Sequence, residues 1–208
     1  LNNIGEYAFA YCSNLGSVKI PGSVSTINPW TFYGCRNMSS LTLQVGLTSI
    51  GDFAFMSCSG LTSITIPSGT SKIGNYAFLE CSGLASVTLP YSMNLIGTNA
   101  FSDTPASLFV YPGSVGEAYA KSNDLPYELL PIESVTSIAL DETSLLMNQG
   151  DIFPLIVTCS PPDATIKAVN WTSSDTAVAM VTTDGQVMAV GLGSATITAT
   201  AKDGGGAS

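Results

Sequence analysis

The cysteines are the first residues whose type and spacing could support chemistry. Four of the five recur at a step of 23 residues, at Cys12, Cys35, Cys58 and Cys81. Stacked at strand spacing, they could form disulfides, bind a metal ion or fill a core. Parallel side-chain directions give a poor disulfide dihedral, and the long step is not a chelating spacing. We therefore expect the four thiols to pack as small apolar side chains.

Histidine is absent, which excludes Ser-His-Asp and Cys-His nucleophile sites and the commonest zinc ligand sets. Paired carboxylates could still hydrolyse glycosides, but we expect no catalytic pair among Glu6, Asp52, Glu80 and Asp103. The acids considered in the second half of the chain are Asp141, Glu142, Asp151, Asp163, Asp175, Asp184 and Asp203. They form no D-x-[DN]-x-[DN]-G loop, so we expect them to lie on a solvated surface, with calcium binding as an open alternative. The sequence predicts no enzyme and no cofactor.

The charge balance also excludes classes of partner. Six basic and 15 acidic side chains give a net charge of −9, which argues against nucleic acid. No run of 18 apolar residues occurs, so we expect no membrane insertion. Residues 1–112 carry four acids and three bases, whereas 133–208 carry eight acids and two bases. This asymmetry predicts a boundary near residue 130.

A repeat of 23 residues organises the first half of the chain. Each unit has the form I-G-x-x-A-F-x-x-C-x-x-L-x-x-V-x-I-P. The isoleucine and phenylalanine positions show the step; they are Ile4, Ile27, Ile50, Ile73 and Ile96, and Phe9, Phe32, Phe55, Phe78 and Phe101. A further series predicts aligned inward positions at Val18, Leu41, Ile64, Val87 and Val110. One unit buries too few apolar side chains to fold alone, so the pattern predicts a solenoid stabilised by stacking.

Each turn of the solenoid is predicted to contribute one parallel strand. Leu61, Ile64 and Ile66 would point inward while Ser63 and Thr65 point outward. The outward positions then form two columns, which are Ser17, Ser40, Ser63 and Ser86 beside Lys19, Thr42, Thr65, Thr88 and Tyr111. Hydroxyl side chains suit any exposed strand. Alternatively, this flat and weakly charged sheet is a docking face for an extended partner.

The end of the solenoid carries a capping signal. Ser114 and Glu117 have the spacing of a capping box, which predicts a short helix within a cap at about 113–130. We expect its Val115, Ala118, Tyr119 and Leu125 to face the core.

The second repeat departs from the pattern at 28–31, where Trp30 either forms an exposed aromatic feature or packs inward.

The repeats resemble the BspA-like leucine-rich repeat family of bacterial surface proteins, through IGDFAFMSCSGLTSITIP at 50–67 and IGNYAFLECSGLASVTLP at 73–90. The resemblance covers residues 4 to about 112. It implies attachment to host matrix proteins or to other cells, and it brings no catalytic residues. Because the first residue falls inside a repeat, we expect a trimmed piece of a longer exported protein.

The second half shows short alternating runs separated by turn signals, typical of an antiparallel β-sandwich. The runs are 135–140, 145–147, 151–159, 166–171, 177–181, 186–190 and 194–200. Asp184 and Gly185 form a hairpin signature, and Pro154 predicts an edge strand or a bulge. Cys159 has no partner cysteine in this half, so we expect five free thiols, and two disulfides would contradict that.

These runs resemble the group-two bacterial immunoglobulin-like domain, through VTSIALDETSLLMNQGD, SPPDATIKAVNWTSSD and DGQVMAVGLGSATITATAKDG. The resemblance implies that Trp171 is a core residue. The predicted architecture is mainly β, with a leucine-rich-repeat solenoid and its cap at 1–130 and an immunoglobulin-like domain at 131–208.

The predicted function is non-enzymatic binding at a bacterial cell surface or after secretion. We expect a monomer that binds a protein or glycan on host or neighbouring cells through the solenoid. The alternative is a spacer or stalk segment of a larger surface protein.

Overall fold

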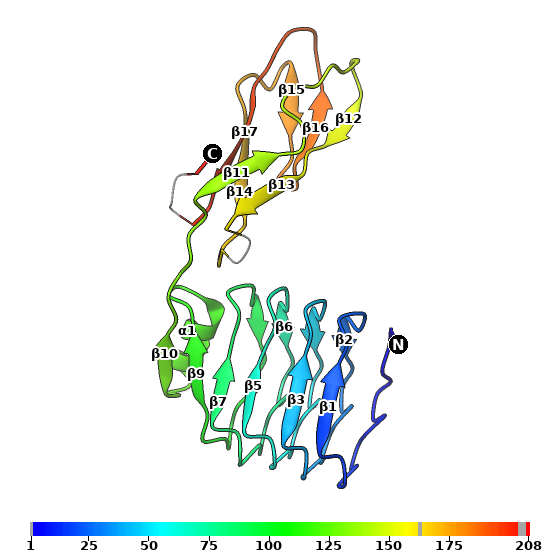
Figure 1. Cartoon of the computed structure of the whole chain (residues 1–208), viewed down its shortest axis with the longest axis vertical. Helices are drawn as coiled ribbons and strands as arrows, with labels where there is room; N and C mark the ends of the chain where they lie inside the picture. The colour runs from blue at the N-terminus through cyan, green and yellow to red at the C-terminus, as the bar shows by residue number, and fades with distance from the viewer. Residues whose placement is uncertain (1, 162–163, 204–206) are drawn as a thin grey trace. The chain divides into compact units, whose positions relative to one another are not determined.

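The computed structural model (Figure 1) describes residues 2–161, 164–203 and 207–208. The chain forms two compact units, Leu1–Pro131 and Ile132–Ser208. The first unit is a β-solenoid with one short helix, and the second is a set of antiparallel strands. Each unit is described by itself below.

The main sheet of the solenoid runs along one side of the stacked turns (Figure 1). It consists of two parallel ladders, with β3 beside β5. The first ladder is β1 (Ser17–Ile20) and β3 (Ser40–Leu43), and the second is β5 (Ser63–Thr65), β7 (Ser86–Thr88), β9 (Ser107–Val110) and β10 (Tyr127–Leu129). Ile64 is buried between the exposed Ser63 and Thr65, as predicted. In β5 and β7 the alternation therefore places Ile64 and Val87 in the core and turns their hydroxyl neighbours outward.

A second parallel sheet joins the turns, so the prediction of one strand per turn is wrong. Its strands have two residues each and lie in the order β2 (Thr26–Ile27), β4 (Ser49–Ile50), β6 (Lys72–Ile73) and β8 (Leu95–Ile96). The glycine that follows the isoleucine lets the backbones of successive turns meet. A Cβ atom on Gly74, for example, would lie 2.5 Å from the backbone nitrogen of Asp52. This approach allows a second hydrogen-bonded ladder that apolar spacing alone does not reveal.

The segments between these two sheets also pair from turn to turn. The backbone N–H of Phe32 donates to the carbonyl of Ala54 at 2.8 Å, and that of Phe55 donates to Ala77 at 2.8 Å. The backbone here includes left-handed residues, with φ of 60° at Trp30 and 58° at Phe53. The backbone groups of the turns are thus satisfied by neighbouring turns although the segment is not a regular strand.

A continuous stack of phenylalanine rings fills the core. Phe9, Phe32, Phe55, Phe78 and Phe101 stack with centroid separations of 5.1–5.3 Å. The last four of these side chains are completely buried, whereas Phe9 is 38% exposed. The 23-residue step therefore sets one ring above the next, and each ring covers the face of its neighbour.

The last repeat is two residues shorter between Thr104 and the start of β9, which corrects the predicted alignment. Val87 pairs with Leu108 and Thr88 pairs with Phe109. Val110 therefore does not align with Val87. Thr104 replaces the repeat cysteine, and its hydroxyl donates locally to the carbonyl of Phe101 at 2.8 Å. The tighter local turn shifts the register of the strand that follows.

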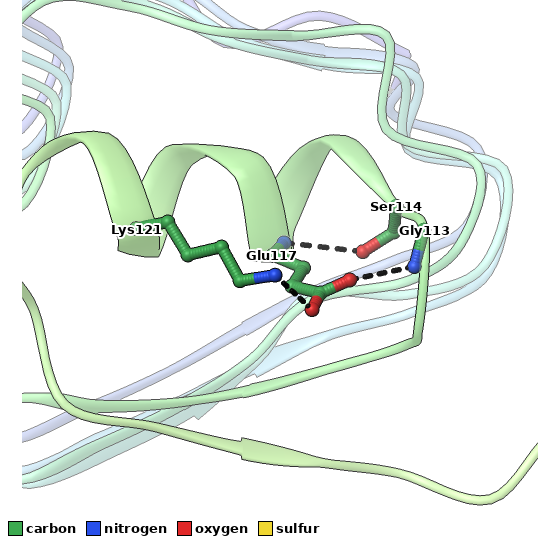
Figure 2. Close-up of polar contacts among 4 residues, drawn as sticks. All are labelled: Gly113, Ser114, Glu117 and Lys121. Atoms are coloured by element: carbon green, nitrogen blue, oxygen red, sulfur yellow. Dashed lines mark hydrogen bonds and ion pairs between the residues drawn. The ribbon is translucent and has the colours of Figure 1, made fainter.

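The cap contains the helix α1 (Val115–Ser122). Figure 2 shows the hydroxyl of Ser114 accepting from the N–H of Glu117 at 3.2 Å, while the Glu117 carboxylate accepts from the N–H of Gly113 at 2.6 Å. Lys121 forms an ion pair with Glu117 at 2.7 Å. The Lys121 side chain, followed by the Gly113 N–H, lowers the pKa of Glu117. The predicted helix start at Ser114 is confirmed.

The inward face of α1 is partly as predicted. Val115, Tyr119 and Leu125 pack against the core. The prediction for Ala118 is wrong, because this side chain is exposed. Gly116 and Ala120 are buried in its place, because the inward stripe of a helix follows steps of three and four residues.

The second unit has strands β11 (Ser137–Leu140), β12 (Ile152–Pro154), β13 (Val157–Ser160), β14 (Val169–Ser173), β15 (Ala179–Val181), β16 (Gln186–Ala189) and β17 (Ile197–Ala201). They pair antiparallel as β11-β13, β12-β16-β15 and β14-β17. Pro154 ends the edge strand β12, as predicted for an edge position. Gly185 turns the β15–β16 hairpin with φ of 86°.

Three predictions for the second unit are wrong. Residues 145–147 form no strand, and the run at 151–159 supplies two strands that are separated after Pro154. Trp171 is half-buried and does not belong to the core. Its ring lies over the turn at Gly185, where a Cβ atom would be 2.8 Å from Cζ2. The core cluster consists instead of Val135, Ala164 and Ala201, with Ile138, Cys159 and Ala207 packed against it.

Candidate binding surfaces of the solenoid

The predicted docking face consists of outward side chains on the main sheet. Ser17 pairs with Ser40 and Lys19 with Thr42, while Ser63 pairs with Ser86 and Thr65 with Thr88. β3 and β5 lie side by side (Figure 1), which joins the two halves of the array. Six of these eight side chains are exposed, and the other two, Ser86 and Thr88, are half-buried. These eight residues, which we call the hydroxyl face, are brought together as two columns.

Tyr111 is the one predicted member that lies outside these columns. The residue aligned with Thr88 is Phe109, because of the shorter last repeat. Tyr111 follows the end of β9 and makes an edge contact with Tyr91, with centroids 6.3 Å apart. The hydroxyl face therefore ends at a half-buried phenylalanine ring rather than at a tyrosine.

The solenoid has a second ordered surface that was not predicted from the sequence, although Trp30 was singled out. Tyr7, Trp30, Phe53 and Tyr76 stack with centroid separations of 5.7, 4.1 and 4.9 Å and interplanar angles of 8–13°. Tyr7 is 55% exposed and the other three are half-buried. We call these four residues the aromatic ladder. Their own step of 23 residues was the signal that could have identified them.

Two further rings extend the aromatic ladder sideways. Tyr33 makes an edge contact with Trp30 at 5.2 Å, and Tyr11 makes an edge contact with Tyr33 at 4.9 Å. Tyr11 is 67% exposed. Its hydrogen bond with Tyr33, followed by burial, raises the pKa of Tyr33. Trp30 therefore neither stands alone nor turns into the core, and it joins neighbouring turns at the surface.

The turn segments that bear the aromatic ladder are acidic. They contain Glu6, Asp52, Glu80 and Asp103, with Arg36 as the single base among residues 5–16, 28–39, 51–62, 74–85 and 97–106. Lys19 and Lys72 lie instead in strands β1 and β6. Asp52 accepts from the N–H of Asn75 at 2.8 Å, and Glu80 accepts from Ser57 at 2.7 Å. The acids thus stabilise neighbouring turns and also give this side of the solenoid its charge.

The repeat cysteines have a packing role with one exception. Cys35, Cys58 and Cys81 are fully buried, whereas Cys12 is exposed, contrary to the prediction for all four. Within the described solenoid, the three buried thiols belong to the same core cluster as the phenylalanine stack, and Cys12 does not. Burial raises the pKa of Cys81 to about 12, and the pKa of Cys58 is also raised by burial. All five cysteines are free thiols.

The structure identifies no metal centre within residues 2–161, 164–203 and 207–208, where no three metal-ligating side chains gather. Asp163, one of the acids considered for calcium, lies outside the described residues. Asp151 accepts from the N–H of Asn148 at 2.8 Å, and Asp184 is held by Thr182 and Gln186. These carboxylates stabilise turns. Among the helices of the described part, none is long and apolar enough to cross a membrane.

Comparison with known proteins identifies relatives of much greater length. A protein from Clostridium acetobutylicum is 37% identical over 92 residues, which are 44% of this chain and 9% of that protein. An enzyme from Bifidobacterium longum named alpha-L-arabinofuranosidase is 43% identical over 75 residues, which are 34% of this chain and 7% of the enzyme. The matched parts thus span less than a tenth of these two relatives.

The structural comparison agrees with the repeat architecture. The crystal structure of a leucine-rich repeat protein from Bacteroides ovatus matches with a TM-score of 0.52 and 27% identity, over 59% of this chain and 32% of that chain. The sequence model of the BspA type leucine rich repeat region, with six copies, matches residues 2–123. The model of the bacterial Ig-like domain (group 2) matches residues 134–208.

Domains of these two kinds are typically non-catalytic and occur in bacterial surface or secreted proteins, where leucine-rich repeats generally mediate protein binding. With its repeat model covering more than half of the residues, the chain belongs to the BspA-type leucine-rich repeat family and carries a group 2 bacterial Ig-like domain after the repeats.

Proposed function

We propose that this chain is the recognition part of a non-enzymatic bacterial protein that attaches to host matrix proteins or to other cells. The solenoid binds a protein or glycan through the hydroxyl face, and the Ig-like unit supports it. The chain acts outside the cell, on the surface or after secretion, and as a monomer. The BspA-type repeats and the Ig-like domain support this setting, because both are typical of such proteins.

The observation that carries the proposal is the register of the hydroxyl face. Ser63 and Thr65 are aligned with Ser86 and Thr88, and no acid stands in either column. Strands in a sheet are spaced about 4.8 Å apart, so the face offers a regular array of donors and acceptors. Across β3, β5 and β7, an extended partner could hydrogen-bond to successive turns without burying an unpaired charge, because Lys19 on β1 is the single charged member of the face.

The experiment compares the full chain with Ser63→Lys/Thr65→Lys. Immobilised matrix proteins and glycans are tested at two salt concentrations. The proposal predicts saturable binding to at least one of them, lost in the double variant because two long cations obstruct and charge the array. A matched control, Ser137→Lys/Thr158→Lys, places the same charges on exposed strand residues of the Ig-like unit. Equal binding by the two double variants would contradict the proposal.

A spacer function is the second candidate, and the lengths of the relatives favour it. The matched segments make up only 9% and 7% of two larger proteins, one of which is named as an enzyme. Such proportions are those expected of accessory modules attached to another functional domain. Absence of saturable binding by the full chain at both salt concentrations would support this candidate over recognition.

A further inference from the structure

The aromatic ladder occupies a backbone position that does not favour aromatic side chains. Tyr7, Trp30, Phe53 and Tyr76 have φ between 57° and 60°. Glycine and asparagine adopt this left-handed conformation most readily, whereas a bulky side chain there costs free energy. Four successive turns nevertheless hold an aromatic residue at this position. A non-glycine residue in this region is a reason to look for function.

The fold itself does not require these rings. Asn99 takes the same position in the last turn, with φ of 54°. A second left-handed position in each turn holds mainly small or polar residues, namely Gly34, Ser57, Glu80 and Asp103, with Tyr11 in the first turn. The chain therefore forms equivalent left-handed turns with and without an aromatic side chain.

The arrangement of the rings indicates the class of ligand. Trp30 is stacked between Tyr7 and Phe53, and Phe53 is stacked between Trp30 and Tyr76. Both faces of Trp30 and of Phe53 are covered by neighbouring rings, so these two rings offer no open platform for a sugar ring. Tyr7 is 55% exposed and the other three rings are half-buried, so each ring keeps part of its area at the surface. Such amphipathic rings are enriched at the centres of protein interfaces.

The charges around the aromatic ladder indicate the chemistry of the partner. Four acids and one base lie in the turn segments, as described above. Glu80 is exposed and lies one turn beyond Ser57, which donates to it. A partner that brings positive charge to this surface gains complementarity, whereas an acidic partner is repelled.

We infer that the aromatic ladder and the acidic turns around it form a second interaction surface, which binds a basic segment of a protein partner. The aliphatic parts of arginine or lysine side chains pack against the ring edges, and their charged groups meet the carboxylates. This surface uses none of the residues of the hydroxyl face. Its existence does not depend on whether the hydroxyl face binds a ligand.

The test uses the full chain and a fluorescent dodecapeptide of alternating arginine and leucine, titrated by anisotropy. The same peptide with glutamate in place of arginine, and cellohexaose, serve as alternative ligands. Saturable binding of the arginine peptide is expected, with roughly tenfold or greater weakening in Phe53→Asn/Tyr76→Asn. Asparagine suits the left-handed backbone. Val45→Asn/Leu95→Asn changes two exposed apolar residues elsewhere on the solenoid and should bind like the unmodified chain.

Charge variants provide an independent test that leaves every ring in place. Glu80→Gln/Asp103→Asn should weaken binding of the arginine peptide at low salt, whereas Glu133→Gln/Glu142→Gln in the Ig-like unit should not. Circular dichroism verifies that each variant is folded. Unchanged affinity in the ring variant, equal losses in the two charge variants, or preference for the glutamate peptide or cellohexaose would overturn the inference. If the ring variant does not fold, the charge variants decide the outcome.

Discussion

The thiol of Cys58 donates a hydrogen bond to the backbone carbonyl of Phe32, 26 residues earlier, at a distance of 3.1 Å. The same contact recurs from Cys81 to Phe55 at 3.1 Å and from Cys35 to Phe9 at 3.0 Å. Each cysteine thus satisfies a carbonyl in the preceding turn while it fills the core with its sulfur. The repeated cysteine is an element of stacking.

Thiol reactivity should follow burial. In the native chain, we expect a thiol reagent to modify exposed Cys12 rapidly and buried Cys58 and Cys81 only after unfolding, because the reactive thiolate is disfavoured in the core. Mass spectrometry of labelled peptides separates the sites. Denaturant should expose all five thiols. Detection of two disulfides in the purified chain would contradict the assignment.

The stability of the solenoid should fall at high pH because of the buried thiols. Burial raises the pKa of Cys81 from 9.0 to about 12 in the folded chain. The stabilisation is therefore complete below pH 9 and is lost as the pH rises toward 12. Each such thiol contributes a slope of up to about 1.4 kcal/mol per pH unit. Denaturant unfolding at several pH values should show a shallower decline for Cys81→Ala, and an unchanged slope would disprove this.

Removal of one ring from the phenylalanine stack should destabilise the solenoid strongly. Phe55 is completely buried between Phe32 and Phe78. Its replacement by alanine should cost about 3–5 kcal/mol in the free energy of unfolding. In a Trp171→Phe background, Trp30 is the remaining tryptophan, so its fluorescence follows the unfolding of the solenoid. The control Val45→Ala alters an exposed side chain and should change stability by less than about 0.5 kcal/mol. Similar losses in both variants would contradict the described core.

The cap should contribute through its first turn. Ser114→Ala removes the hydroxyl that accepts from the N–H of Glu117 (Figure 2) and should cost about 1 kcal/mol. Ser82→Ala makes the same chemical change at an exposed turn residue and serves as the control. In the Trp171→Phe background, Trp30 fluorescence during denaturant unfolding measures the stability of both variants. No difference between the two variants would mean that the helix start does not stabilise the solenoid.

The periodicity of the sequence was sufficient to predict the stack of Phe32, Phe55 and Phe78 and the outward direction of Ser63 and Thr65. These features follow from apolar spacing, which the folded chain converts directly into inward and outward positions. The second sheet was not predicted because strands of two residues are too short to show an alternation of apolar and polar side chains. The position of Tyr111 was wrong because a shorter turn after Thr104 shifts the register without interrupting the apolar pattern.

The aromatic ladder escaped for a different reason. Its members differ in residue type, and Trp30 was interpreted as an exception within its own repeat. The 23-residue step linked it to Tyr7 and Phe53, but the left-handed backbone that turns these rings to the surface is not visible in hydrophobic spacing. In the second unit, the position of Trp171 depends on its contact with Gly185, a relation between segments that are distant in the sequence.

Photo-crosslinking from the hydroxyl face would show whether a bound ligand lies against these strands. Benzoylphenylalanine is placed at Thr65 in one variant of the full chain and at Thr158, an exposed residue of the Ig-like unit, in another. With a ligand from the binding panel, we expect a covalent adduct from Thr65 and none from Thr158. An adduct from Thr158 alone, or binding that persists without any adduct from Thr65, would contradict recognition through this face.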